Sequence, residues 1–261
     1  MATIDISHVS KIFRDAKRSS NVTALDDINI SVARNQFLCL LGPSGCGKST
    51  LLNMIAGFEQ PSSGSICIDG QPVTAPGADR GVVFQQANLM PWLPVWENVA
   101  FHLLLSGSQK GERRARAQTY IDMVGLTGFE NHYPSELSGG MNQRVGIARA
   151  LLMNPQVILM DEPFGALDEQ TRMDMQNELV RIWQQHQGTI VFVTHGIDEA
   201  LTLGTHVAVM SARPGRIREI IPIELPRPRD ITSPQFNAMK RHILELLRGE
   251  RTPSPLEVVN Q

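Results

Sequence analysis

The chain of 261 residues has only three cysteines, too few for a scaffold held together by cysteine chemistry. Cys39, Cys46 and Cys67 are odd in number and do not have the spacing of metal ligands. The sequence therefore indicates neither a disulfide framework nor a structural metal site. We expect all three thiols to be reduced, as thiols are in a cytosolic compartment.

Long apolar runs are also absent. No stretch approaches about 18 consecutive apolar residues, the length that a membrane-spanning helix needs. The N-terminus, MATIDISHVSKIF, alternates apolar with polar residues and has no apolar export segment. If the protein serves a membrane, the sequence predicts that it does so as a peripheral subunit.

Neither sign of charge is in large excess. The sequence has 24 Lys and Arg against 26 Asp and Glu, a formal net charge of −2, which argues against a dedicated nucleic-acid binder. Its 42% hydrophobic and 19% charged residues are typical of a soluble globular protein. The length allows a sizeable core in one or two domains.

The motif that dominates the sequence is GPSGCGKS at residues 42–49, which matches the phosphate-loop pattern G-x-x-x-x-G-K-[ST] at every fixed position. Residues 36–41 predict a buried strand before it, and residues 49–56 predict the first turns of a helix after it. The glycines let backbone N–H groups surround a phosphate. We expect Lys48 to reach the β- and γ-phosphates and the Ser49 hydroxyl to ligate Mg²⁺. A glycine-rich turn that only joins strand to helix is disfavoured, because every fixed position is present.

Three more apolar runs predict buried strands with polar side chains at their ends. They are residues 79–85 ending in Gln85, residues 157–162 ending in Asp161 and Glu162, and residues 189–194 followed by His195. Strand ends are where parallel α/β sheets place their ligand groups. Two buried acids are costly without a cation or a chemical task. Asp161 suits an outer-sphere partner of Mg²⁺, and Glu162 suits the group that orients or deprotonates the attacking water.

Each of these side chains also has a structural interpretation. Taken alone, Gln85 is at least as compatible with an ordinary loop amide, the acids with a structural pair, and His195 with a structural histidine. The presence of a phosphate loop in the same chain favours the functional interpretation of the acids. For His195, the position at the tip of a third core strand favours it too.

Residues 137–144 (LSGGMNQR) precede apolar residues at helical spacing and predict the start of a helix. The N-terminus of that helix can face an anion. Equally, Ser138 can act only as its N-cap.

Two aromatic features have two interpretations each. Phe13, near the end of the first predicted strand, is either a core aromatic or a stacking platform for adenine. Residues 89–96 (LMPWLPVW) form an apolar stretch whose two prolines predict a loop or a short turn. Its aromatics either fold back on the core or offer a surface to a partner.

The remaining segments complete the predicted order of elements. The basic run in residues 110–116 is interpreted as a solvated helix face without a site. The sequence predicts strands at residues 3–9, 25–32, 65–69 and 207–210, a surface loop at 14–21, a mainly helical region at 86–153, a loop at 163–168, helices at 171–186 and 237–247, and a tail from residue 225.

LSGGM and the DE-tipped strand, together with the phosphate loop, resemble the ATP-binding subunit of ATP-binding-cassette (ABC) transporters over almost the whole chain. The resemblance implies an α/β fold: a P-loop NTPase (RecA-like) core with an N-terminal antiparallel β-subdomain and an inserted α-helical subdomain at about residues 86–153. The cassette would comprise residues 1–225, and residues 226–261 a short tail with one helix.

Position by position, the resemblance implies the following roles. Phe13 lies where the family has an aromatic under adenine, Gln85 matches the glutamine loop and a Mg²⁺ ligand, and His195 matches the switch histidine. Catalysis would involve Lys48, Gln85, Glu162 and His195, and Mg²⁺ would be held by Ser49, Gln85 and Asp161. The first phosphate motif would comprise Gly42, Pro43, Ser44, Gly45, Cys46, Gly47, Lys48, Ser49 and Thr50; the signature Leu137, Ser138, Gly139, Gly140 and Met141; and the dimer loop Gly165, Ala166, Leu167 and Asp168.

Two residues depart from the family pattern. Met141 replaces the usual glutamine and Gly165 the usual serine, which weakens any expectation of polar contacts from these positions.

The resemblance also implies partners. The working unit would be a homodimer, with each ATP between the phosphate loop of one copy and Ser138 and Gly140 of the other. It would sit at the cytoplasmic face of the membrane with integral permease subunits and a substrate-binding protein. Residues 76–85, 89–101 and 210–217 are similar to the nitrate, sulfonate and taurine importer group, and we favour taurine or an alkanesulfonate over nitrate.

Three alternatives are less consistent with the sequence. A soluble cassette ATPase that remodels nucleic acid or ribosomes usually has two cassettes or a long coiled-coil insertion, and this chain has neither. A P-loop kinase or GTPase leaves LSGGM and His195 unexplained, and no guanine-reading N-K-x-D sequence is present. An exporter is a closer rival, but no fused membrane segment is found and PGADRGVVFQ is importer-like.

Overall fold

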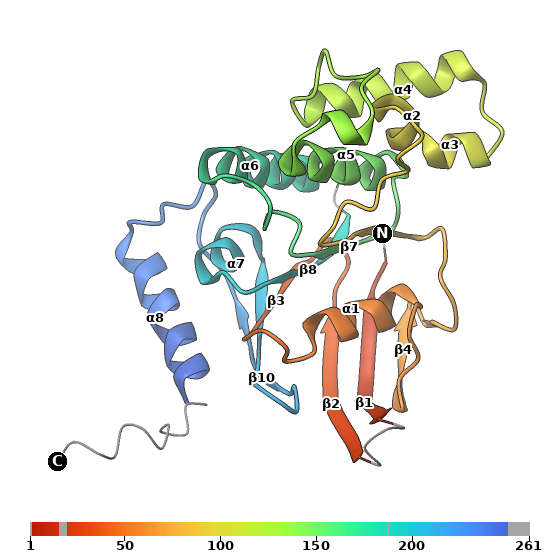
Figure 1. The fold of residues 1–261 in the computed structure, drawn as a ribbon. Helices are drawn as coiled ribbons and strands as arrows, with labels where there is room; N and C mark the ends of the chain where they lie inside the picture. Colours follow the sequence, from red (N-terminus) through yellow and green to blue (C-terminus); the bar gives the residue numbers. More distant parts are fainter. Residues whose placement is uncertain (1, 16–19, 187, 250–261) are drawn as a thin grey trace.

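The computed structural model describes residues 2–15, 20–186 and 188–249, which form two β-sheets with helices around them (Figure 1). A four-stranded antiparallel sheet has the order β2-β1-β4-β5, and a six-stranded sheet has the order β10-β9-β3-β8-β7-β6. In the larger sheet every pairing is parallel except that of β10 with β9. The predicted α/β class is confirmed.

The strands of the antiparallel sheet are β1 (Ile4–Asp15), β2 (Ser20–Val32), β4 (Ser63–Ile68) and β5 (Gln71–Pro72). Those of the larger sheet are β3 (Phe37–Leu41), β6 (Arg80–Val83), β7 (Val157–Asp161), β8 (Thr189–Thr194), β9 (His206–Met210) and β10 (Ile217–Pro222). The helices are α1 (Lys48–Ala56), α2 (Val95–Val99), α3 (Phe101–Leu105), α4 (Lys110–Met123), α5 (Gly139–Leu152), α6 (Glu169–His186), α7 (Ile197–Leu203) and α8 (Pro234–Arg248), with a 3₁₀ turn at Pro134–Glu136.

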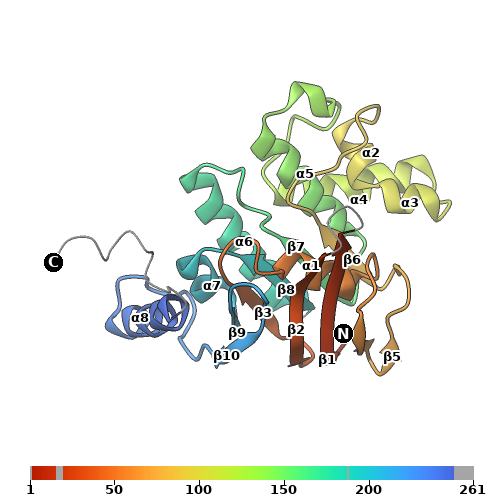
Figure 2. The same ribbon diagram turned by 60° about the horizontal axis from the view of Figure 1, so that its bottom comes forward.

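β3 lies between two hydrophobic cores because its side chains alternate between the faces of the sheet. On one face, Phe37, Cys39 and Leu41 belong to the core that also contains residues of α2 to α8. On the other face, Leu38 and Leu40 belong to the core shared with α1 and the antiparallel sheet. Helices α2 to α5 form a group of their own beyond the larger sheet (Figures 1 and 2). The phosphate loop follows β3 directly and is therefore anchored to a strand that is buried on both faces.

The first two strands extend beyond the predicted limits. Arg14 pairs with Asn21 and Asp15 with Ser20, so the ends of the expected surface loop are strand, and its residues 16–19 lie outside the described part. Ladder hydrogen bonds join backbone groups, so polar residues do not prevent pairing.

The predicted helical region also differs in its start, because α2 begins only at Val95, directly after Pro94. α7 and β10 were not predicted from the sequence. α7 has seven residues, and β10 alternates only briefly before Pro222 ends it, so neither carries enough periodicity to be recognised.

Residues 226–249 pack on the core. Arg227 donates to the carbonyl oxygens of Thr202 (2.8 Å) and Leu203 at the end of α7, and Arg229 donates to that of Gly204 at 2.6 Å. Burial, together with the neighbouring Arg227, lowers the pKa of Arg229 to about 10. α8 adds Phe236 and Ile243 to the core. Within the described ranges no helix has the length and apolarity to cross a membrane.

Candidate functional site

The phosphate loop connects β3 to α1, as the sequence predicts. Gly45 and Gly47 have φ angles of 77° and 100°, values that favour glycine. A Cβ on Gly47 would also lie 2.6 Å from Leu25 Cδ2, so this position has no room for a side chain. The first N–H groups of α1 have no acceptor within the helix and face the loop, which makes this end of α1 a suitable site for an anion.

Lys48 is held at the same loop. Its side chain is 5% exposed, and its ammonium group donates to the carbonyl oxygens of Gly42 (2.8 Å) and Pro43 (3.0 Å). Both acceptors are neutral. A buried ammonium group with neutral acceptors gains most from an anionic ligand, because the charge is then compensated.

The register of the larger sheet brings the predicted strand ends together. Val83, Met160, Phe192 and Cys39 form one row across β6, β7, β8 and β3. Gln85, Glu162 and Thr194 each lie two residues beyond that row, and His195 and Gly42 three residues beyond it. The side chains at the three strand tips and the phosphate loop therefore lie along one edge of the sheet, the one formed by the carboxyl ends of its parallel strands.

Ser49 and Asp161 connect the loop to β7. The Ser49 hydroxyl donates to Asp161 Oδ1 at 3.0 Å. Burial raises the pKa of Asp161, and the hydrogen bond from Ser49 opposes that shift. A cation at this hydroxyl and carboxylate would offset the cost of burying the acid.

Glu162 and His195 form a second pair at this edge. His195 Nδ1 lies 3.1 Å from Glu162 Oε2, and the two side chains are 65% and 21% exposed. Glu162 has a φ angle of 43°, uncommon for a residue with a side chain, and its N–H donates to Val193 O at 3.0 Å. A carboxylate beside an accessible imidazole can accept a proton from a water molecule bound next to the pair.

A polar network behind His195 escaped the sequence analysis. Glu199 accepts hydrogen bonds from the Thr194 hydroxyl and from Gln176 Nε2 (3.0 Å), and Thr194 Oγ1 accepts from Gly196 N at 2.9 Å. Burial raises the pKa of Glu199, against the effect of these hydrogen bonds. The network fixes the backbone on both sides of His195. The signal in the sequence is weak: a threonine at the end of a strand whose four central residues are apolar.

Gln85 is exposed and lies just past the end of β6. The backbone before it is fixed by Gln143 of α5, which is 2% exposed and donates from Nε2 to Phe84 O at 2.8 Å. The predicted strand up to Gln85 is too long, since β6 ends at Val83. Gln85 therefore connects the sheet edge to the helices that follow it.

The LSGGM segment forms the start of α5. Ser138 caps the helix by accepting from Met141 N at 3.2 Å, while Ser138 and Gly139 remain exposed. A Cβ on Gly140 would lie 3.0 Å from Leu167 Cδ2, so this end of α5 packs against residues 165–168. Asp168 in turn accepts from Thr171 N at 3.0 Å at the start of α6. The capping and anion-facing interpretations are compatible, because the cap leaves the helix end open to solvent.

Phe13 is 42% exposed, so the interpretation as a core aromatic is wrong. The Lys11 ammonium lies 5.1 Å from the centre of its ring. Stacking of adenine on this ring stays a prediction.

Comparison with known proteins settles the family. The family model described as ABC transporter matches residues 25–165, more than half of the chain. This chain belongs to the ABC transporter family. It is an ATP-binding subunit of that family and an ATPase. A nitrate import ATP-binding protein of Synechocystis is 47% identical over 258 residues, covering 95% of this chain and 96% of the relative. An aliphatic sulfonates import ATP-binding protein of Bacillus cereus is 45% identical over 243 residues, covering 93% and 95%.

A solved ABC structure has the same fold. It is the dimeric, post-hydrolysis state of an ATP-binding cassette with bound ADP and Pi, 33% identical with a TM-score of 0.77, covering 85% of this chain and 99% of that one.

Mg²⁺ fits the oxygen donors of this ABC site. Among the described residues no group of three or more His, Cys, Asp or Glu side chains could hold a metal ion by itself. Mg²⁺ does not need such a group, because it keeps several water ligands and binds one or two protein oxygens plus phosphate. Ser49 and Asp161 provide such oxygens next to the phosphate loop.

Proposed function

We propose that this chain hydrolyses MgATP to power an importer of a small anion or zwitterion, with taurine or an alkanesulfonate as the favoured cargo. The observation that carries the proposal is the shared sheet edge of Lys48, Ser49, Asp161, Glu162 and His195. A phosphate cradle, oxygen donors for a cation and a water-activating carboxylate are the parts that phosphoryl transfer requires.

In this proposal the residues of the phosphate motif, Gly42 to Thr50, bind the phosphates, with Lys48 on the β- and γ-phosphates. Ser49, Asp161 and Gln85 hold Mg²⁺, which neutralises charge on the phosphate oxygens when it is bound. Glu162 orients and deprotonates the attacking water. His195, 3.1 Å from Glu162, keeps that carboxylate in place and lies near the γ-phosphate side of the site.

We further propose that the working unit is a homodimer in which Ser138 and Gly140 face the ATP of the partner copy. No hydrogen bond among the described residues joins residues 137–141 to residues 42–50, and Ser138 is exposed. The helix end at Ser138 is therefore accessible to an anion outside its own subunit. Residues 165–168 pack beside it and would contribute to the same interface. ATP between two rigid bodies holds them closed, and hydrolysis releases them.

The membrane partner is proposed to dock on residues 89–96. Trp92 is 72% exposed, whereas Trp96 is 4% exposed and part of the core, so the two aromatics have different environments. The loop around Trp92 has a defined shape because Asn98, fully buried, donates to Met90 O (3.1 Å) and Leu93 O (2.8 Å). A large apolar side chain on an ordered exposed loop suits a protein interface. The chain would thus be a peripheral subunit at the cytoplasmic face of the membrane.

Replacing Trp92 by alanine tests this docking. Because buried tryptophans dominate interface energies, we expect co-purification of the permease with this chain to fall at least about tenfold. ATP hydrolysis by the isolated chain should stay within about twofold of wild type, because Trp92 is an exposed residue that has no part in the proposed phosphate or Mg²⁺ site. Ile231→Ala is the matched control, since Ile231 is 52% exposed on another surface. Undiminished permease recovery with Trp92→Ala would contradict the docking surface.

The cargo is tested with the complete transporter in lipid vesicles. We expect ATP hydrolysis to rise severalfold when the cognate solute and its binding protein are added, because the loaded binding protein favours the closed dimer. Taurine, alkanesulfonates and nitrate would be compared at equal concentration. Stimulation by a sulfonate supports the favoured cargo. Stimulation by nitrate alone would replace it, in line with the nitrate-import relative, and no stimulation by any of these solutes would argue against this importer group.

A further inference from the structure

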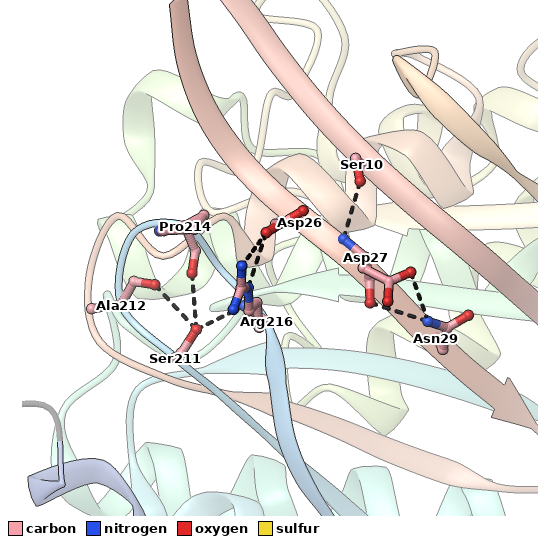
Figure 3. A network of polar contacts seen from close by, with 8 residues as sticks. All are labelled: Ser10, Asp26, Asp27, Asn29, Ser211, Ala212, Pro214 and Arg216. Atoms are coloured by element: carbon pink, nitrogen blue, oxygen red, sulfur yellow. Dashed lines mark hydrogen bonds and ion pairs between the residues drawn. The ribbon is translucent and has the colours of Figure 1, made fainter.

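The turn between β9 and β10, residues 211–216 (SARPGR), is braced by its own hydrogen bonds (Figure 3). Ser211 N donates to Arg216 O at 2.9 Å, and Arg216 N donates to Ser211 Oγ at 2.8 Å. The Ser211 hydroxyl donates to Pro214 O at 2.9 Å. The β9–β10 turn is therefore a rigid unit.

This turn is joined to β2 on one side. Asp26 N donates to Gly215 O, and Gly215 N donates to Ala24 O, both at 2.9 Å. Arg216 adds an ion pair with Asp26, with Nε and Nη2 at 3.0 and 2.5 Å from Oδ2 (Figure 3). The turn thus has a fixed position relative to the antiparallel sheet.

On its other side the turn touches the phosphate loop. A Cβ on Gly215 would lie 2.0 Å from Cys46 O, so the two backbones are in direct contact at a position where only glycine fits. Arg213 donates from Nε to Gly45 O at 3.0 Å. Two consecutive carbonyl groups of the loop are therefore covered by the β9–β10 turn.

We propose that Arg213 is a positioning residue for the phosphate loop, which it holds in the phosphate-binding conformation through the Gly45 carbonyl. This inference rests on the proposed function, in which the loop binds ATP. It adds a residue that lies 168 positions from Gly45 in the sequence.

The effect follows from the geometry of the peptide group. In a planar trans peptide the carbonyl and the N–H point in opposite directions. Because Arg213 holds the Gly45 carbonyl, the N–H of the same peptide, on Cys46, points away from Arg213, and within the loop it donates only a long hydrogen bond, 3.4 Å, to Pro43 O, which a phosphate oxygen could replace. The guanidinium charge also polarises this peptide and strengthens its N–H as a donor to phosphate. Arg213 should therefore affect nucleotide binding more than the chemical step.

The test uses Arg213→Ala in the full chain. We expect the Kd for ADP and the KM for ATP to rise about tenfold, the effect of losing a hydrogen bond to a charged group, with kcat at saturating ATP within about twofold of wild type. The Kd and KM of Arg213→Lys should lie between those of wild type and those of Arg213→Ala, because lysine retains the charge but not the Nε–H geometry. Arg218→Ala removes the same charge from β10 and should leave Kd and KM within about twofold.

Five outcomes separate the possibilities. The inference is supported by a rise in Kd and KM in Arg213→Ala alone, with an unchanged Tm of the nucleotide-free protein. Unchanged values of Kd and KM would overturn it. Equal increases of Kd and KM in Arg213→Ala and Arg218→Ala would also overturn it, because they would indicate a general effect of charge and not positioning of the loop. If Arg213→Ala lowers the Tm into the assay range, Arg213→Gln is used with the same expected result. Absence of hydrolysis by the wild-type chain would instead refute the proposed function.

Discussion

Replacing Glu162 by glutamine is expected to lower ATP turnover at least about a hundredfold, the scale of a lost general base, while ATP still binds. Glutamine has nearly the same shape as glutamate and can keep a contact with His195, but it cannot accept a proton from water. Asp161 and Ser49 are unchanged, so the proposed Mg²⁺ ligands remain. Phosphate release and the Kd for ATP, measured on the same preparation, separate turnover from binding.

The chain offers a matched control for this variant. Glu219 and His242 also form a carboxylate–histidine pair, at 3.2 Å, on β10 and α8. Glu219→Gln removes such a pair away from the strand tips that carry Glu162 and His195, and should leave turnover within about twofold. Turnover of Glu162→Gln within about threefold of wild type would mean that another group activates the water.

The sheet edge that carries Glu162 is predictable from the sequence because buried parallel strands are nearly continuous apolar runs. β7 and β8 have this pattern, and a polar residue after such a run can only lie at its tip. The phosphate loop adds a motif whose fixed positions have separate physical reasons. Order along the chain then suffices to predict that Glu162 and His195 share an edge, even though their 3.1 Å contact depends on the sheet register.

Contacts between elements far apart in the sequence are not predictable in this way. Periodicity does not distinguish Trp92 from Trp96, because their burial depends on the packing of the helix that starts after Pro94. It also gives no sign that Glu199 supports Thr194, or that Arg213 reaches Gly45. These contacts depend on how helices and sheets pack against one another. The apolar periodicity of a single segment carries no information about that packing.

The second large effect is expected from Lys48→Ala, which should lower kcat/KM for ATP about a thousandfold. The lost contact is charge-assisted and acts on both the bound phosphates and the transition state. Lys48 is 5% exposed and, among the described residues, donates only to neutral carbonyls. The free-energy cost of burying its charge is therefore not offset by a hydrogen bond to a carboxylate within the protein. Removing it should therefore leave the Tm of the nucleotide-free protein unchanged or slightly higher.

Lys240→Ala is the control for the loss of one lysine charge, because Lys240 pairs with Asp198 at 2.7 Å and is partly exposed. It should leave kcat/KM within about twofold of wild type. The Tm and the kcat/KM of Lys48→Ala test the same hypothesis. A buried lysine whose role is to bind an anion lowers the stability of the ligand-free protein and raises its affinity for the anionic ligand. A large fall in Tm together with a less than about tenfold loss of kcat/KM would instead assign Lys48 a structural role in the phosphate loop.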